Sequence, residues 1–462
     1  MLDDKVRAFL QRKGLKLDNK KLLIGVSGGP DSLALLHFLW SKKEQYNLQI
    51  IAAHVDHMFR GEESLAEAKF VQQFCEARKI PFEMERVNVP QHIQKTGKSS
   101  QIAARECRYQ FFEKVMSNHE TDYLVLGHHG DDQVETILMR LTRGSSGEAR
   151  AGIAFLRPFG KGQILRPFLC LNRMQIEEYC LEHDLDPRRD PSNDKGIYSR
   201  NRFRKEIMPF LRKENPQVHE HFQRFSEEIQ SDEFFLQELT VQKMNKVMDK
   251  KSAQEIILNI RDFQAMPMPL QRRGIQLILN YLYKKKPASL SALHTENVFS
   301  LISNPHPSGT LHFPSGLNIV RSYEKCYFLF RSHSVQSYRF EIAGPGEVKL
   351  PTGSSIVFEY TQGSGEGFKP HTLLLDCNAI SLPIVIRTRE NGDRMKLKGM
   401  QGSKKVKDIF IDKKVPLQER NTWPIVTDSK GEILWIPGLK ESQYSTGCHS
   451  DSRYILLSYM EK

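Results

Sequence analysis

The first two hundred residues alternate between short apolar runs and longer amphipathic segments, and this alternation constrains the fold more than any other feature. Apolar runs of strand length lie at 22–26, 48–54, 82–89 and 123–127. Segments with helical spacing lie at 32–40, 62–79, 101–116 and 131–141. The expected core contacts of the third segment are Ile102, Ala103, Tyr109, Phe112 and Val115. Strands separated by helices of this length predict βαβ units, and therefore an α/β domain with a doubly wound parallel sheet.

The pattern changes after about residue 215. Helical stretches are expected at 219–248, 270–283 and 291–302, followed by strand-like pieces at 309–313, 318–322 and 326–330. From about residue 334 onward, short strands and glycine turns predominate. We therefore expect three domains: an α/β domain over 1–215, a mainly helical middle domain over 216–333 and a β-rich C-terminal domain over 334–462.

Glycines and hydroxyls join the first strand to the first long helix. The segment reads Ser27-Gly28-Gly29-Pro30-Asp31-Ser32. Adjacent glycines let backbone N–H groups turn toward a ligand, and a helix start favours negative charge, so we expect a phosphate site. Asp31 would repel phosphate, so it either caps the helix or approaches phosphate through Mg²⁺. Gly97-Lys98-Ser99 is not a Walker loop, because the position that needs another glycine is His92.

Composition narrows the class of protein. The formal net charge of +12 favours a polyanionic partner such as nucleic acid. The seven cysteines are scattered and never spaced as C-x-x-C, which argues against disulfides, a zinc ribbon and a redox pair. No apolar run approaches the roughly 20 residues that a bilayer requires, and the N-terminus lacks a secretory pattern. We expect a cytoplasmic protein that does not bind membranes.

Polar residues follow two further strands. The string His54-Val55-Asp56-His57 ends the second, and Gly127-His128 closes the fourth before a helix that carries Asp132 and Glu135. Spaced three apart, the two carboxylates project from one helical face and repel each other. A cation between them would resolve the conflict, either Mg²⁺ or the ammonium of an amine substrate. The alternative is a solvated acidic first turn, favoured by the helix dipole.

These motifs resemble those of the N-type ATP pyrophosphatases, or PP-loop proteins, whose fold is of the adenine-nucleotide-hydrolase type. The larger arrangement looks like the tRNA(Ile)-lysidine synthetase family. That resemblance implies that ATP adenylates cytidine 34 of tRNA(Ile) with a CAU anticodon, and that L-lysine then displaces AMP. It implies ATP binding by Ser27, Gly28, Gly29, Pro30, Asp31, Ser32, His54, Asp56, His57, Gly127 and His128. It also implies Mg²⁺ at Asp31 and Asp132 and catalytic roles for Asp132 and Glu135.

Arginines complete the expected site. Arg108 matches an essential arginine of the family, and an Arg-Asn-x-x-Arg core matches Arg200, Asn201 and Arg204 within 190–205. Arginine suits phosphate because its planar fork donates two hydrogen bonds. Alternate arginines on a helix point in different directions, so one of Arg200, Arg202 and Arg204 would meet ATP and another RNA. We expect catalytic roles for Arg200 and Arg204 and an RNA contact for Arg202.

The C-terminal domain contains a basic stretch. Between 381 and 420 there are eleven Lys or Arg residues against five Asp or Glu residues. Such a stretch suits phosphate contacts, which position a nucleic acid without reading its sequence. The expected RNA contacts are Arg387, Arg389, Arg394, Lys396, Lys404 and Lys405. Trp423, Trp435 and Tyr444 either stack on bases or belong to a core.

Two questions stay open at this point. The alternative function is tRNA thiolation on the same fold, which usually needs paired cysteines or an iron–sulfur cluster, and the sequence lacks such a pair. The oligomeric state is undetermined, with a homodimer as one alternative.

Overall fold

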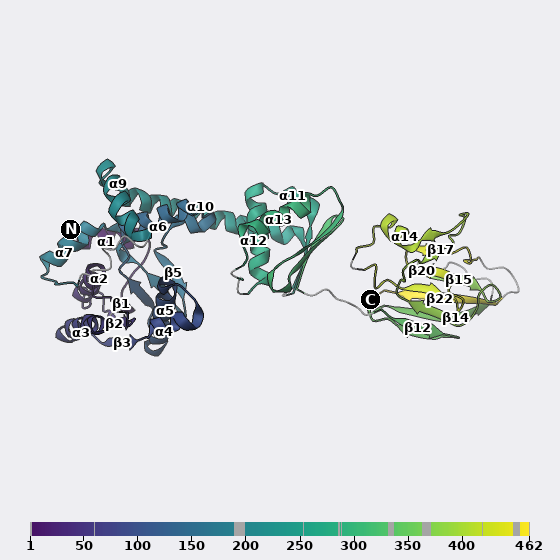
Figure 1. Cartoon of the computed structure of the whole chain (residues 1–462), viewed down its shortest axis with the longest axis horizontal. Coiled ribbons are helices and arrows are strands. Elements are labelled where there is room, and N and C mark those ends of the chain that lie inside the picture. The colour runs from purple at the N-terminus through teal and green to yellow at the C-terminus, as the bar shows by residue number, and fades with distance from the viewer. Residues whose placement is uncertain are drawn as a thin grey trace. The chain divides into compact units, whose positions relative to one another are not determined.

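A computed structural model of the chain describes residues 2–59, 61–188, 199–252, 254–284, 287, 289–330, 337–362, 371–417, 419–446 and 453–461. It contains two compact units, Met1–Phe235 and Leu236–Lys462 (Figure 1). Within the described residues, no helix is both long enough and apolar enough to cross a membrane.

A six-stranded sheet organises the first unit. Its order is β3 (Phe82–Arg86), β2 (Gln49–Asp56), β1 (Lys21–Gly25), β4 (Tyr123–Leu126), β6 (Gly162–Leu165) and β5 (Leu156–Phe159). The strands from β3 to β6 pair in parallel, and β5 is antiparallel to β6. Parallel strands end at one edge of a sheet, so the segments after β1, β2, β4 and β6 share that edge. The expected α/β class is confirmed.

Helices cover both faces of this sheet. The four long ones that follow strands are α2 (Pro30–Ser41), α3 (Glu62–Ala77), α5 (Ser100–His119) and α6 (Gly130–Thr142). The others are α1 (Leu2–Arg12), α4 (Val89–Thr96), α7 (Arg173–Glu182), α8 (Ser199–Arg202), a π-helical turn at Phe203–Ile207 and α9 (Met208–Glu214). Leu22 and Ile24 of β1 belong to one hydrophobic core and Leu23 to another. This division explains why the strand is apolar throughout.

One expected core contact is wrong. Ile102 is 53% exposed, whereas Ala103, Phe112 and Val115 are buried and Tyr109 packs against the core. The first two turns of α5 pack through Ala103 and Cys107 on Val89 of α4, and this leaves Ile102 on the outer face.

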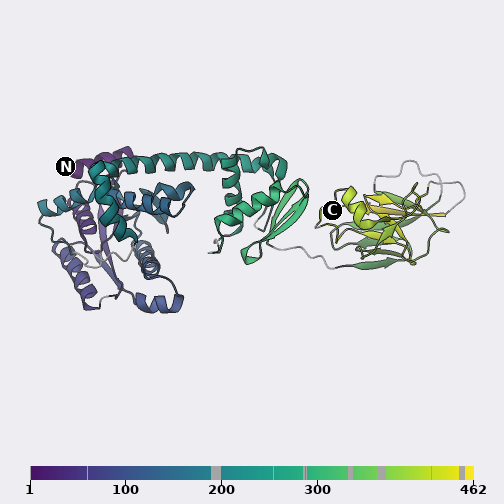
Figure 2. The same ribbon diagram turned by 45° about the horizontal axis from the view of Figure 1, so that its top comes forward.

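The boundary between the two units falls within the long helix α10 (Val218–Val247), between Phe235 and Leu236. Figure 2 shows this helix as a continuous ribbon. Side chains of its first half contact the first unit, so that unit extends to Phe235 rather than to the sequence boundary at 215. The expected boundary at 333 falls within 331–336, outside the described residues.

The second unit begins with a mainly helical part that also contains a sheet. Its helices are α11 (Ile260–Gln264), α12 (Met268–Leu282) and α13 (Ala292–Ser303). The sheet has the order β7 (Met248–Lys251), β8 (Glu255–Asn259), β11 (Lys325–Leu329), β10 (Asn318–Ser322) and β9 (Ser308–His312). The last three confirm the expected strand-like pieces, whereas β7 and β8 were missed.

The C-terminal part is β-rich, as expected. One sheet has the order β12 (Arg339–Ile342), β16 (Ile384–Arg387), β19 (Ile425–Thr427), β20 (Ile433–Ile436) and β21 (Lys440–Glu441). The other has the order β13 (Gly346–Lys349), β14 (Ser355–Gln362), β22 (Arg453–Met460) and β15 (Thr372–Asp376). A short pair, β17 (Arg394–Met395) and β18 (Lys404–Lys405), precedes α14 (Val406–Asp412). Trp435 is buried in the core, and Trp423 and Tyr444 pack against cores, which favours the structural alternative for all three.

Candidate active site

The loop between β1 and α2 has the backbone expected of a phosphate site. Gly28 has φ +88°, a conformation that favours glycine, and the N-cap of α2 is Gly29, without a side-chain cap. The Ser32 hydroxyl accepts a hydrogen bond from Ser27 N at 3.1 Å and donates to Gly29 O at 3.1 Å. The hydroxyls therefore shape the loop, and the uncapped start of α2 leaves its first N–H groups for an anion.

Gly127 brings the end of β4 against this loop. A Cβ atom at this position would lie 2.8 Å from the backbone oxygen of Asp31, so any larger residue would force the two segments apart. The close approach places the residues after β4 beside the start of α2.

Asp31 does not cap α2, because the structure records no side-chain cap there. Its Oδ1 is buried and lacks a hydrogen-bond partner among the described residues, and it lies 3.7 Å from His129 Nε2. Burial raises the pKa of this carboxyl group, and Asp132 raises it further. A buried, unsatisfied carboxylate oxygen at a phosphate loop fits a cation-binding role.

Asp132 and Glu135 are held by two arginines. Asp132 Oδ1 accepts hydrogen bonds from Arg200 at 2.7 Å and from Arg204 at 3.1 Å. Glu135 accepts one from Arg200 Nε at 2.8 Å and one from Arg204 Nε at 2.7 Å. We call these four residues the carboxylate–arginine cluster. The cation that the sequence required between the two carboxylates is thus a pair of guanidinium groups.

Spacing explains which arginines join the cluster. Arg200 and Arg204 are four residues apart, so they share one helical face, whereas Arg202 is exposed. This division agrees with the sequence prediction, which grouped Arg200 with Arg204 and set Arg202 apart. The preceding acidic and glycine segment, 190–198, lies outside the described residues.

The carboxylates and arginines of the cluster shift one another's pKa values. Burial alone would raise the pKa of Asp132, but His129, Arg200 and Arg204 outweigh it and hold that pKa below its ordinary value. For Arg204, burial alone would lower the pKa, but Glu135 and Asp132 outweigh it and hold that pKa above its ordinary value. Asp132 is 8% exposed and Glu135 is 1% exposed. Both side chains therefore lie in a poorly hydrated place.

The string His54-Val55-Asp56-His57 lies at the end of β2, and its residues have different partners. His54 Nδ1 lies 2.9 Å from Val26 O, and Asp56 accepts hydrogen bonds from Arg86 Nε at 2.9 Å and Met58 N at 2.8 Å. These two residues fix the strand end beside the loop. Nδ1 of His57 is buried and has no hydrogen-bond partner among the described residues.

Arg108, His57 and His128 form a second set at the same edge. Burial and the charge of Arg108 lower the pKa of His57 to about 4. Burial lowers the pKa of His128 to about 3, with Arg166, Arg200 and Arg108 contributing. Burial also lowers the pKa of Arg108, which makes no ion pair with a carboxylate of the described chain. Neutral rings beside an unpaired guanidinium suit an anionic ligand that carries an aromatic base.

A cavity of about 310 Å³ lies beside Glu135 and Arg204. It is lined by His129, Asp131, Glu135, Arg173, Met174, Glu177, Arg204, Met208 and Arg212. Asp131 Oδ2 accepts hydrogen bonds from Arg173 N at 2.8 Å and from an Arg212 guanidinium nitrogen at 2.7 Å. Sequence reasoning missed this cavity because α7 and α9 come from segments without a motif.

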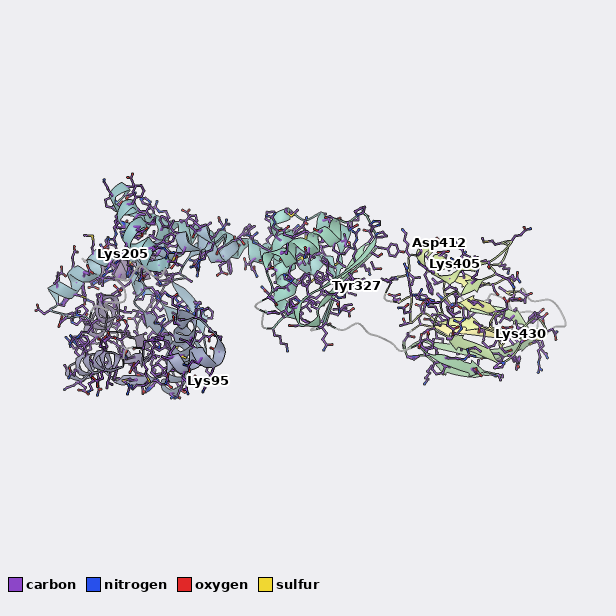
Figure 3. All side chains as sticks on the ribbon, in the orientation of Figure 1. Lys95, Lys205, Tyr327, Lys405, Asp412 and Lys430 are labelled. Carbon is purple, nitrogen blue, oxygen red and sulfur yellow. The ribbon has the colours of Figure 1, made fainter. Side chains whose placement is uncertain are left out.

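The expected RNA contacts of the C-terminal part differ in accessibility. Arg387 is buried and donates two hydrogen bonds to Asp393 at 2.9 and 2.8 Å, so it holds a turn and does not face solvent. Lys396 pairs with Glu432 at 3.1 Å, Lys404 pairs with Asp412, and Arg389 donates to Asn421 at 2.9 Å. Lys405 and Asp412 are both labelled in Figure 3; Lys405 is the N-cap of α14, and Asp412 is its last residue.

Arg394 and Lys405 form the most available pair of cations. They lie opposite each other on β17 and β18, and both are exposed. Arg394 donates to the hydroxyl and carbonyl of Ser403, each at 2.9 Å. Like charges directly opposite on a strand pair repel, so an anion would stabilise this arrangement.

The described cysteines do not form a catalytic or metal-binding group. Cys75, Cys107, Cys170, Cys180, Cys326 and Cys377 are free thiols. Burial raises the pKa of each, to about 12 for Cys75. Among the described residues, no three His, Cys, Asp or Glu side chains are placed to bind one metal ion. Cys448 lies outside the described residues.

Three family models match the chain. A PP-loop domain matches residues 2–211, a TilS substrate binding domain matches 258–327, and a TilS substrate C-terminal domain matches 384–453.

Curated relatives match nearly the full length. The tRNA(Ile)-lysidine synthase of Bacillus cereus is 48% identical over 462 residues, which cover 99% of this chain and 97% of that protein. The enzyme of the same name from Bacillus subtilis is 48% identical over 460 residues, with the same coverage. A solved structure of a TILS C-terminal domain is 43% identical and covers 27% of this chain and 97% of its own, with a TM-score of 0.26.

Proposed function

Because the chain belongs to the tRNA(Ile)-lysidine synthase family, we propose that it joins L-lysine to C2 of cytidine 34 in tRNA(Ile) with a CAU anticodon. ATP supplies the driving force and leaves as AMP and pyrophosphate. The product base changes both the codon read and the amino-acid identity of the tRNA.

The observation that carries the proposal is the meeting of two different sites at one sheet edge. The uncapped loop before α2 suits a triphosphate, and the carboxylate–arginine cluster follows β4, the strand beside β1. Arg200 and Arg204 each keep part of the side chain exposed, 40% and 30% respectively. They can therefore bind ligand phosphate while they remain near the carboxylates.

Mg²⁺ fits Asp31 better than Asp132. Asp31 Oδ1 lacks a described partner, whereas Asp132 accepts hydrogen bonds at both oxygens. Mg²⁺ commonly takes one or two protein carboxylates and completes its shell with phosphates and water. When bound, it would neutralise the charge of the pyrophosphate that leaves. Asp31 is the residue we expect to hold it.

The proposed reaction proceeds in two displacements. The cytosine O2 attacks the α-phosphorus of ATP, an O–P bond forms, and the bond to the bridging oxygen breaks with loss of pyrophosphate. The lysine amine then attacks C2, a C–N bond forms, and the C2–O bond breaks with loss of AMP. Glu135, a buried carboxyl group of the cluster, is suited to take the proton that the amine loses. Arg200 and Arg204 are suited to stabilise the charge on the transferred phosphate.

The 310 Å³ cavity suits the amino acid. It combines guanidinium groups of Arg173 and Arg212 with the carboxylates of Glu135 and Glu177. A free amino acid presents one carboxylate and, for lysine, two ammonium groups, so both signs of charge have partners. We propose that lysine occupies this cavity with its reactive amine toward Glu135.

The test is a measurement of pyrophosphate release from ATP with transcripts of tRNA(Ile) and each of the twenty amino acids. We expect release, together with labelled amino-acid incorporation, with lysine alone. Incorporation of another amine would overturn the substrate assignment. Sulfur incorporation from a sulfide donor would instead favour thiolation, for which the described cysteines offer no low-pKa thiol.

A further inference from the structure

Four arginines that no expected function used lie near one another in the first unit, and three of them, Arg105, Arg157 and Arg166, lie near Tyr109. The four are Arg105 on α5, Arg140 on α6, Arg157 on β5 and Arg166 just after β6. We call them the arginine patch. The Arg105 guanidinium lies 4.7 Å from the centre of the Tyr109 ring, and that of Arg157 lies 5.8 Å from it. The Tyr109 hydroxyl also accepts a hydrogen bond from Arg105 at 3.3 Å.

The patch lacks acidic partners. Across the described residues, none of its four arginines forms an ion pair with a carboxylate, although surface arginines elsewhere in this unit do. Glu106, which follows Arg105, pairs with Lys98 at 2.6 Å. Arg140 and Arg166 donate to backbone oxygens instead, at 2.7 Å to Ala149 and 2.6 Å to Ala154.

The charges lie close enough to interact unfavourably. Burial, together with the charges of Arg157 and Arg105, outweighs the opposing effect of Tyr109 and lowers the pKa of Arg166 to about 10. The pKa of Arg140 is lowered mainly by burial and to a smaller extent by the charge of Arg105. Gathering like charges costs free energy unless a ligand of opposite charge offsets it.

The position of the patch connects it to the reaction centre. Strand β6 pairs in parallel with β4, and Leu165 aligns with Val125. Arg166 and His128 therefore follow the ends of neighbouring strands, and Arg108 lies on the same helix as Arg105. The patch begins beside the residues expected to contact the nucleotide and extends toward β5, the edge strand.

Tyr109 acts as a rigid support for two of the guanidinium groups. Its ring packs edge-on against Phe159 at 5.5 Å and Phe112 at 6.3 Å, so it is anchored in the core. Arg105 and Arg157 are exposed, and cation–π contact limits their rotamers. Binding a phosphate there costs less side-chain entropy than binding it to free arginines. Ile102, one turn before Arg105, adds an exposed apolar contact on the same helix.

We propose that the arginine patch binds the phosphates of the RNA strand that flanks the modified cytidine. The exposed guanidinium groups of Arg105 and Arg157 suit a polyanion laid on the surface, and the half-buried Arg140 and the buried Arg166 add positive charge nearby. The proposal rests on the proposed function, since it assumes that the substrate is RNA. It adds a docking surface on the first unit to the basic stretch of the C-terminal part.

The test compares two double variants of the full-length enzyme, each lacking two exposed positive charges. Arg105→Ala with Arg157→Ala removes the exposed part of the patch. The matched control, Lys16→Ala with Lys43→Ala, removes two exposed lysines that lie before β1 and β2, at the opposite edge of the sheet. Affinity for a labelled tRNA(Ile) transcript is measured over a range of KCl concentrations, together with kcat, KM for tRNA and KM for ATP.

The patch variant is expected to bind the transcript about tenfold more weakly, with the slope of log Kd against log salt reduced by roughly 1.4. Its kcat at saturating tRNA and its KM for ATP should match the wild type, and the control should match in every measurement. Tyr109→Leu should weaken binding and Tyr109→Phe should largely restore it, because phenylalanine keeps the aromatic support.

Each failure has a distinct signature. Wild-type enzyme that neither binds nor modifies the transcript removes the proposed function itself. An active wild type with a patch variant of unchanged affinity and salt slope removes only this inference. A raised KM for ATP with unchanged RNA affinity would reassign the patch to the nucleotide and overturn the proposal.

Discussion

In the first unit, Arg200 and Arg204 hold Asp132 and Glu135, whereas in the C-terminal part Arg387 holds Asp393. Both arrangements consist of arginine forks on carboxylates, and the arginines of both were expected from sequence to contact ligands. Their surroundings differ. The Arg387 side chain is 8% exposed and that of Asp393 is 10% exposed, while Arg200 and Arg204 are 40% and 30% exposed beside a cavity. A closed ion pair fixes the fold, and an open one remains available for chemistry.

The largest expected effect tests the open cluster. Glu135→Gln keeps the size and hydrogen-bonding capacity of the side chain but removes its charge. We expect lysine incorporation to fall by at least about a thousandfold, because the group loses its proton-accepting role. Transcript binding should stay near wild type. Incorporation is measured with labelled lysine under single-turnover conditions.

Asp132→Asn supplies a second variant, since Asp132 accepts hydrogen bonds from both arginines. Its loss of incorporation should be similarly severe. Normal turnover in either variant, at wild-type transcript affinity, would end the assignment of the cluster to the reaction.

The second effect tests the closed pair. Arg387→Ala leaves Asp393 buried without its guanidinium, and breaking a buried pair in this way costs about 3–5 kcal/mol. We expect that loss in the free energy of unfolding of the C-terminal part, measured by hydrogen exchange of amides in β16. Turnover per folded molecule should be unchanged at saturating tRNA.

Replacing both partners separates structure from binding. Arg387→Leu with Asp393→Leu removes both buried charges and should recover most of the stability lost in the single variant. If Arg387→Ala is as stable as wild type and instead weakens tRNA binding, Arg387 contacts RNA after all, and the structural assignment is wrong.

A smaller effect is expected where cations are exposed in the same region. Arg394→Ala with Lys405→Ala should reduce the slope of log Kd against log salt by up to about 1.8, without a change in stability. Lys404→Ala is the matched comparison, because Lys404 is already paired with Asp412. An identical salt slope in the double variant would remove these residues from the interface.

The local sequence predicted the phosphate loop and the strands at the sheet edge, because these features depend on residues that are close together in the chain. Gly28 needs a positive φ, Gly127 needs space against Asp31, and the strands around them are apolar throughout. The burial of Arg387 was not predictable in this way. Its carboxylate partner lies only six residues away, but the cores that exclude water from both come from distant strands.

Partners far apart in sequence account for the other misses. Asp131 is held by Arg173 and Arg212, which come from α7 and α9, so no motif links the three. The arginine patch likewise draws on α5, α6, β5 and the end of β6. Ile102 followed the apolar spacing of its helix and is still exposed, because α4 covers only the neighbouring face.

The smallest expected effect concerns acid stability of the first unit. Burial lowers the pKa of His37 to about 4, of His57 to about 4 and of His128 to about 3. An unfolded histidine titrates near 6.5, so between about pH 6.5 and 4 the unfolded chain binds more protons than the folded one. Acidification through that window should therefore destabilise the unit.

His37 isolates this effect, because its ring bonds the Tyr179 hydroxyl at 3.0 Å and takes no part in the cluster. His37→Gln keeps a hydrogen-bonding group and removes one titrating site. The fall in hydrogen-exchange protection of β1 amides between pH 6.5 and 5 should be smaller in this variant than in wild type. An equal fall would mean that His37 is already protonated in the folded protein. The acid sensitivity would then arise from His57 and His128 at the open site.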